Sequence, residues 1–247
     1  MEYYILASGS KGNCTVVKNG DEFIVIDCGT SKRYLKNSFE KIGLNYLDAE
    51  ALLVTHEHSD HIKQIEMFDP IPIYAPFEVM SVRDERLVEP LEEFDIGCFH
   101  IMPIPLSHDT RDTVGYIISA DGETLVEVTD TGYLSHNNKE LVKNADYYVF
   151  ESNYDMVMLM SSNRPQYLKS RIISDSGHLS NEQSAEILAD VIGPRTKEIV
   201  LAHISQECNT RDIAYQNLID TFESYNIDPG NYRIHSAAQY EIYKGGK

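Results

Sequence analysis

The segment LVTHEHSDHI, residues 53–62, decides the fold, because an apolar run is followed by four side chains of metal-ligand type within six residues. The run ALLVT at 51–55 predicts a buried strand. Imidazole nitrogens and carboxylate oxygens suit zinc and similar divalent ions. A polar loop that is rich in histidine by chance is the alternative, and three histidines with an aspartate at this spacing disfavour it. The candidate ligands are His56, His58, Asp60 and His61.

The 247 residues are within reach of one large domain or two small ones, and we expect a single domain, residues 1–247. Hydrophobic residues make up 42% of the chain and charged residues 24%, which suffices for a full core and excludes disorder, collagen and coiled coil. No apolar run approaches the roughly 20 residues of a membrane-spanning helix. The start, MEYYILASGSKGN, lacks the features of a signal peptide, so we expect a cytoplasmic protein with no membrane partner. The four cysteines form no CxxC pair, and we expect them to be reduced.

The net charge of −18 constrains the kind of partner. A broad basic surface that grips many phosphates is disfavoured, because such binding depends on Lys and Arg. A nuclease stays open, since carboxylates that bind divalent cations make a site acidic until the metal is counted.

Each half of the chain is rich in short strands that are followed by helices. Residues 31–43 place apolar side chains at helical spacing before Gly43, and Ser180 with Gln183 forms a capping box. We therefore expect an α+β fold, a four-layer αβ/βα sandwich with two sheets inside and helices outside. The expected strands are 3–6, 15–18, 23–26, 51–55, 99–105, 114–119, 124–129, 146–150 and 198–202, and the expected helices are 31–43, 137–144, 180–192 and 210–225.

HxHxDH after a buried strand resembles the metallo-β-lactamase superfamily, and the other motifs of that superfamily follow in order. They stand in IVIDCG, PLSHDT, VTDTG and IVLAHIS. The resemblance implies two divalent ions per chain, zinc or manganese with iron as a third option. It implies that Asp27 orients the HxHxDH loop and that Asp130 bridges the ions. The implied ligands are His56, His58 and His108 for one ion, and Asp60, His61 and His203 for the other.

Local segments resemble one branch, the YycJ/WalJ group of bacterial metallohydrolases, which are considered DNA exonucleases. SGSKGN at 8–13 resembles the SGSxGN opening of that group, and its small residues allow a close approach of the backbone to a ligand or a plain hairpin. ESNYD, LKSRIISDSGHLSN and AHISQECNT resemble the same group, which often has His where Tyr154 stands here. We therefore place Ser8, Ser10 and Asn13 in the substrate site.

Glu151 and His178 together resemble the acid pair of tRNase Z-type nucleases, in which a histidine supported by a carboxylate protonates the leaving oxygen. The pair suits general acid catalysis because a carboxylate stabilises the imidazolium. His178 could instead be a neighbour of the helix cap at 180. The predicted catalytic residues are Asp60, His178, Glu151 and Asp27. We expect structural roles for His100 and His235 and a surface position for His136.

Residues 157–174 contain no acidic residue in a strongly acidic chain. A loop with ordinary surface cations explains this as well as a phosphate contact does. The candidate phosphate contacts are Arg164, Lys169 and Arg171.

The predicted function is metal-dependent hydrolysis of a phosphodiester, most simply by a 5′-to-3′ DNA exonuclease. Bound ions would lower the pKa of the attacking water. A phosphodiesterase for a small or cyclic nucleotide is the first alternative, and a thioesterase or glyoxalase-type hydrolase is the second. The sequence leaves open the metal, the nucleic acid, the polarity and the oligomeric state, with a dimer among the options.

Overall fold

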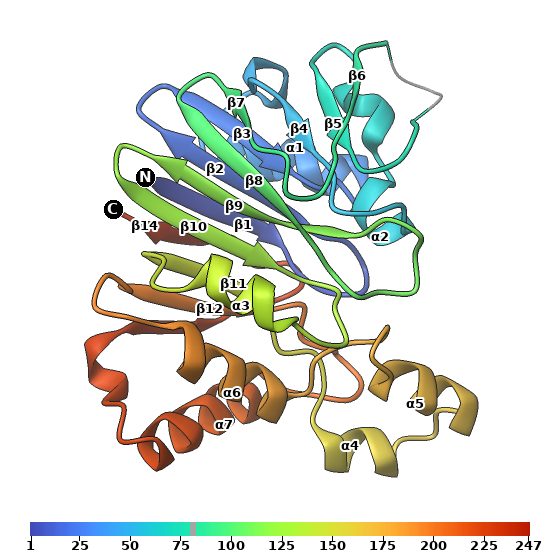
Figure 1. Cartoon of the computed structure of the whole chain (residues 1–247). Helices are drawn as coiled ribbons and strands as arrows, with labels where there is room; N and C mark the ends of the chain where they lie inside the picture. The colour runs from blue at the N-terminus through green and yellow to red at the C-terminus, as the bar shows by residue number, and fades with distance from the viewer. Residues whose placement is uncertain (80–82) are drawn as a thin grey trace.

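The computed structural model describes residues 1–79 and 83–247 (Figure 1). Within these residues the strands form two seven-stranded sheets. The first sheet contains β1 (Glu2–Ala7), β2 (Cys14–Asn19), β3 (Glu22–Ile26), β4 (Leu52–Leu53), β5 (Ile73–Ala75), β6 (Glu85–Leu87) and β14 (Tyr243–Gly246). The second contains β7 (Phe94–Ile96), β8 (Phe99–Pro105), β9 (Val114–Ala120), β10 (Glu123–Val128), β11 (Tyr147–Glu151), β12 (Glu198–Ala202) and β13 (Arg233–Ser236).

Both sheets mix antiparallel and parallel pairs, in the orders β14-β1-β2-β3-β4-β5-β6 and β13-β12-β11-β10-β9-β8-β7. Strands β3 to β6 run parallel, and so do β10 to β13. Because parallel strands end at the same edge of a sheet, the loops that follow them come together there. The last strand, β14, pairs with β1, so both ends of the described chain lie in the first sheet.

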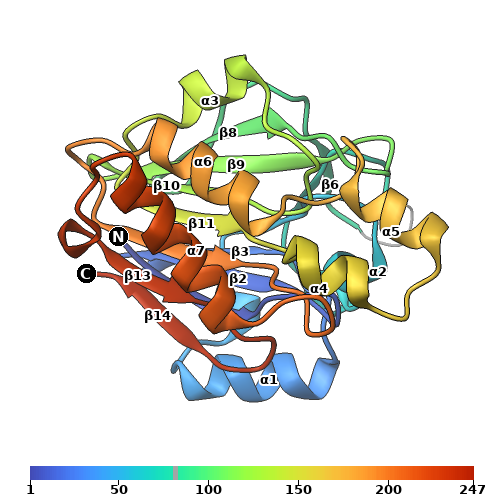
Figure 2. The same ribbon diagram turned by 90° about the horizontal axis from the view of Figure 1, so that it is seen from below.

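Helices cover the outer faces of the sandwich, as Figures 1 and 2 show. On the first sheet lie α1 (Lys32–Lys41) and α2 (Ser59–Ile62), with short 3₁₀ turns at Tyr46–Asp48 and Ile65–Phe68. On the second sheet lie α3 (His136–Val142), α6 (Asn181–Val191) and α7 (Arg211–Ser224), with a 3₁₀ turn at Pro229–Asn231. Two further helices, α4 (Met156–Ser161) and α5 (Gln166–Ile173), project beside the second sheet.

Alternation along the strands explains the layers. In β3, Ile24 and Ile26 point into the core between the sheets, whereas Phe23 and Val25 pack toward α1. In β11, successive residues likewise divide between the central core and the layer beneath α6 and α7. The predicted four-layer α+β sandwich is therefore confirmed. No helix of the described part of the chain is long and apolar enough to cross a membrane.

Two local predictions need correction. The strand expected at 51–55 is shorter, Leu52–Leu53, although Ala51 and Val54 still bond to the neighbouring backbone. It does not reach Thr55, whose amide donates to the Asp27 carboxylate at 2.9 Å. The stretch 157–174 is not a loop but contributes most of α4 and all of α5. The Asp155 carboxylate caps α4 by accepting the Met158 amide at 2.7 Å. The capping box of α6 forms as predicted.

Candidate metal centre

Three predicted site residues lie directly after strand ends with strained backbones. Asp27 follows β3, Asp130 comes shortly after β10 and His203 follows β12, and their φ angles are 59°, 58° and 52°. A non-glycine residue rarely adopts a positive φ, and such strain persists where the surrounding structure enforces it, often at functional sites. The strand ends therefore aim these three side chains at one edge of the sandwich.

The structure brings the seven candidate ligands into two adjacent groups. His56, His58 and His108 offer atoms that all lie within 4.8 Å of one another, and Asp60, His61 and His203 do the same. Asp130 lies between the groups, with its carboxylate 3.1 Å from His61 Nε2, 3.5 Å from His203 Nδ1 and 3.8 Å from His108 Nε2. The two triads match the grouping expected from the sequence, but among the described residues His56, His61 and Asp130 form a further group, so the division of the ligands between two ions stays a prediction.

Asp27 fixes the tautomer of His61. The carboxylate can only accept, so His61 Nδ1 donates to Asp27 Oδ2 at 2.6 Å, and Nε2 is left as the ring nitrogen that can give up its proton to bind a metal ion. The Thr55 hydroxyl donates to the same oxygen at 2.9 Å, and it can therefore accept from His56 Nδ1 at 3.0 Å. One buried aspartate thus turns the Nε2 atoms of two histidines toward the cluster, which is how supporting residues orient metal ligands.

Two further histidines are oriented in the same way. His108 Nδ1 donates to the Gly177 carbonyl at 3.0 Å, and His203 Nδ1 donates to Glu151 Oε1 at 3.0 Å. In both rings the bond to an acceptor leaves Nε2 free to bind a cation.

Unpartnered buried atoms test whether the cluster suits metal ions. Among the described residues, His56 Nε2, His203 Nε2 and Asp130 Oδ2 are buried without a hydrogen-bond partner. Such atoms are costly unless something binds them, and all three are of a type that binds divalent ions. The donor set and its orientation therefore fit divalent metal ions.

The charges of the cluster agree with this. Burial holds the pKa of His56 well below its usual value, with the nearby His61 charge as the next cause, so His56 is neutral as a ligand must be. Burial alone would also lower the pKa of His203, but the nearby carboxylates of Asp130, Asp60 and Glu151 raise it to about 10. The carboxylates thus attract positive charge to this position, which a cation would supply.

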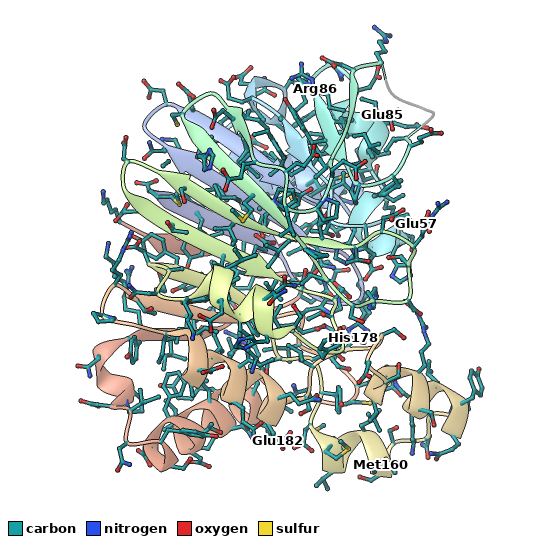
Figure 3. The ribbon with its side chains drawn as sticks, in the orientation of Figure 1. Glu57, Glu85, Arg86, Met160, His178 and Glu182 are labelled. Carbon is teal, nitrogen blue, oxygen red and sulfur yellow. The ribbon has the colours of Figure 1, made fainter. Side chains whose placement is uncertain are left out.

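Glu151 joins the cluster to His178. Its Oε1 accepts from His178 Nδ1 at 2.8 Å as well as from His203, and its Oε2 accepts the Thr131 and Leu179 amides at 2.9 and 3.3 Å. Four donors therefore hold this buried carboxylate in one position. His178 is partly exposed and lines a cavity of about 230 Å³ with His58, His108 and Asp130. Figure 3 shows His178 at the edge of the sandwich beside α5.

The six predicted substrate-binding residues divide into two sets. Ser10, Arg164 and Arg171 line the cavity. Arg164 also pairs with Glu207 at 2.7 Å, and Arg171 pairs with Asp109.

The other set supports the site from outside the cavity. Buried Ser8 accepts the His203 amide at 2.8 Å, and Asn13 Nδ2 lies 3.0 Å from His61 Nε2. The Lys169 ammonium donates to the Met160 and Ser162 carbonyls at 2.6 and 2.8 Å, so it joins α5 to α4.

Sequence reasoning missed Asp109 and Thr55. Asp109 Oδ1 lies 3.3 Å from His108 Nε2 and 3.5 Å from His58 Nε2. A carboxylate directly after a ligand in SHDT was the available signal. Thr55 precedes the first ligand, but its bond to Asp27 spans 28 positions of the chain and leaves no local pattern.

The remaining histidines lie away from the cluster. His100 is exposed and pairs with Asp95 at 2.8 Å and Glu93 at 3.3 Å, so its surroundings are polar. His235 stacks on Tyr243 with 3.9 Å between ring centroids, and His136 is exposed, as expected.

Comparison with known proteins identifies the family. Residues 23–204 match the beta-lactamase superfamily domain. Exodeoxyribonuclease YycJ of Bacillus anthracis is 32% identical over 95% of this chain and 94% of its own length. The metallo-beta-lactamase fold protein YhfI from Bacillus subtilis superposes with a TM-score of 0.74 at 16% identity, covering 99% of each chain. Human tRNase Z, short form, gives 0.67 at 17% identity and 98% of each chain. The chain belongs to the beta-lactamase superfamily and has the metallo-β-lactamase fold.

Proposed function

We propose that this protein is a metal-dependent phosphodiesterase that degrades DNA from the 5′ end, as a 5′-to-3′ exonuclease. The observation that carries the proposal is the His178–Glu151 pair at 2.8 Å, placed at the cavity that the candidate ligands line. Hydrolysis of a thioester has little need for a separate acid, because a thiolate is a good leaving group, whereas an alkoxide leaving from DNA requires a proton. The relative named exodeoxyribonuclease YycJ supports DNA as the substrate.

Two divalent ions, zinc or manganese with iron as a third option, fit the two triads. His56, His58 and His108 would hold one ion, Asp60, His61 and His203 the other, and Asp130 would touch both. When bound, such ions supply a lowered pKa for water and positive charge for the non-bridging phosphate oxygens.

The residues of the chain perform the remaining steps. His178 donates a proton from Nε2 to the leaving oxygen, because Nδ1 is engaged by Glu151. Glu151 stabilises the imidazolium before the transfer and keeps the ring aimed at the cavity. Asp27 holds His61 in its binding tautomer, and Asp60 carries charge at the cavity wall.

Arg164, Arg171 and Ser10 contact the phosphates on either side of the scissile bond. Both guanidinium groups already have carboxylate partners, so an entering phosphate would compete with Glu207 and Asp109 for them. Ser8, Asn13 and Lys169 act by positioning the loops around the site.

Phosphodiester hydrolysis of a small or cyclic nucleotide is the second candidate. The net charge of −18 and the small cavity of about 230 Å³ favour it, since an acidic protein repels a long anionic polymer and a small ligand fills a small cavity.

We also propose that residues 1–247 act as one domain, because β14 returns to pair with β1. We further propose that the protein is cytoplasmic, where its four free cysteines stay reduced.

His178→Ala tests the proposal through the leaving group. The leaving group from DNA is a sugar alkoxide, which leaves poorly unless an acid protonates it. Turnover of DNA by His178→Ala should therefore fall about 10²- to 10⁴-fold. The leaving group of bis-p-nitrophenyl phosphate is a stable nitrophenolate that needs no acid, so this substrate should be turned over almost as fast as by the wild type. His136→Ala, at an exposed histidine that does not line the cavity, is the matched control. Equal rates of DNA cleavage in wild type and His178→Ala would refute the acid, and competition by long DNA against the small substrate separates the two candidates.

A further inference from the structure

A second cavity adjoins the candidate metal centre. It has a volume of about 360 Å³ and shares Ser10 and Asp60 with the first cavity. Lys11, Lys63 and Tyr240 line only this second cavity, whereas Arg164 and Arg171 line only the first. We call it the Lys11–Lys63 groove. Because Asp60 faces both, any extended substrate in the first cavity can continue into the groove.

The two lysines of the groove are unpaired cations. Both are exposed, and among residues 1–79 and 83–247 neither lies within 4.0 Å of a carboxylate oxygen. This contrasts with Arg164 and Arg171, which are already engaged. In a chain of net charge −18, two free ammonium groups beside the catalytic cluster supply the positive charge that a phosphate backbone needs.

The backbone that carries these cations is closely packed. A Cβ on Gly29 would lie 1.5 Å from the Asp60 carbonyl oxygen, and the Asn13 amide donates to that same oxygen at 2.8 Å. The Lys11 amide donates to Gln239 Oε1 at 3.0 Å. The loop that holds Lys11 and the turn that holds Lys63 are thus fixed to one another.

Tyr240 adds an aromatic surface to the groove. Its side chain is 50% exposed, and its ring centroid lies 5.1 Å from that of Tyr34. The Tyr34 hydroxyl donates to the Leu6 carbonyl at 2.8 Å, which fixes the supporting ring. Exposed aromatic rings beside cations are the usual means of binding unpaired nucleotides, because every base can stack on them.

Cations continue beyond the groove on α1. Lys32, Arg33 and Lys36 are exposed in the first two turns, and none of them pairs with a carboxylate among the residues that the structure describes. The helix starts three residues after Gly29, which lines the groove.

The geometry points to the Lys11–Lys63 groove as a binding site for a single-stranded stretch of DNA that extends away from the scissile phosphate. Lys11 and Lys63 contact backbone phosphates, and Tyr240 stacks on a base. The inference rests on the proposed function and deepens it, because it makes an unpaired polynucleotide, rather than a mononucleotide, the substrate form that the protein recognises.

Equilibrium binding of a fluorescent single-stranded oligonucleotide tests this, with the metal-loaded His178→Ala protein as background so that the DNA is not consumed. For single strands the logarithm of the binding constant falls by about 0.7 per phosphate contact for each logarithm of salt concentration. Removing two contacts in Lys11→Gln/Lys63→Gln should reduce this slope by about 1.4. Between about 50 and 200 mM salt, affinity should then fall about sevenfold less than in the parent protein.

The matched control is Lys18→Gln/Lys41→Gln, at the end of β2 and in the last turn of α1, where neither lysine has a carboxylate within 4.0 Å in the described part of the chain. It should keep the parent slope, which separates a local contact from a change in net charge. Tyr240→Ala should weaken binding at least about fivefold, and Tyr240→Phe should not. Thermal unfolding and metal content of each variant confirm that the fold is kept.

The outcomes separate the two proposals. An unchanged slope in Lys11→Gln/Lys63→Gln, or equal slopes in both double variants, would overturn the groove whether or not the wild-type protein cleaves DNA. A reduced slope together with no DNA cleavage by the wild type would support the groove and refute the exonuclease.

Discussion

Replacing Asp27 with Asn should weaken metal binding and also lower the stability of the metal-free fold. Asp27 accepts three hydrogen bonds, at 2.9 Å from the Thr55 amide, 2.9 Å from the Thr55 hydroxyl and 2.6 Å from His61 Nδ1. Asn has the same shape and tolerates the φ of 59°, so the backbone has no reason to move. What changes is that one of the two carboxylate oxygens becomes an NH₂ donor.

The expected size of the effect follows from those bonds. If the Asn oxygen keeps the Thr55 amide, its NH₂ group faces His61, which must then accept at Nδ1 and carry its proton on Nε2. Nε2 faces Asp60 and Asp130, so the ring no longer serves as a ligand. Loss of such an orienting bond lowers metal affinity about 10- to 100-fold. Stability of the metal-free protein should fall by about 1.5–3 kcal/mol, the value of one hydrogen bond to a charged group.

Competition with a chelator measures the affinity for the ions, and urea denaturation of the metal-free protein measures the stability. Asp121→Asn is the matched control, because Asp121 also has a positive φ, 49°, and lies at an exposed turn. It should change neither quantity. If Asp27→Asn bound the ions as tightly as wild type, the orienting role of Asp27 would be wrong.

Three other predictions concern stability. Burial alone would raise the pKa of Glu123, but hydrogen bonds from the N-terminal ammonium, Lys197 and Lys247 hold it well below its ordinary 4.5. The stability this carboxylate adds is present above pH 4.5 and lost as the pH falls below it, so the difference in unfolding free energy between wild type and Glu123→Gln should shrink on acidification; a constant difference would exclude the linkage. Ser180→Ala removes the N-cap of α6 and should lower the free energy of unfolding in urea by about 1 kcal/mol. An unchanged free energy of unfolding would show that the cap does not stabilise the helix. Gly29→Ala forces a methyl group against the Asp60 carbonyl and should cost about 3 kcal/mol, whereas an unchanged unfolding midpoint would contradict the close approach.

Much of the fold could be predicted from the sequence, because long strands such as β8 and β12 carry continuous apolar patterns and α6 carries its own cap signal. The short strands β5, β6 and β7 could not, since three residues hold no periodicity and their pairing depends on the surrounding fold. Helices α4 and α5 were missed because the turn at 162–165, with its proline, interrupts the pattern between them.

The candidate ligands were predictable because their spacing in HxHxDH is local and the other motifs follow in order. The roles of single polar residues were less so. The sequence indicates a phosphate contact for Lys169, whereas in the fold its ammonium donates to two carbonyls, one in α4 and one in the turn that follows. The Lys11–Lys63 groove joins residues from three distant segments, and no linear pattern brings Lys11, Lys63 and Tyr240 together.

Digestion of DNA labelled separately at each end tests the central claim most directly, using protein loaded with manganese whose metal content is measured in the same sample. We expect two ions per chain, progressive release of label from the 5′ end, and neither release nor full metal occupancy in Asp130→Ala. Two ions per chain with no release from either end, or release by Asp130→Ala at wild-type metal content, would contradict a dinuclear DNA exonuclease.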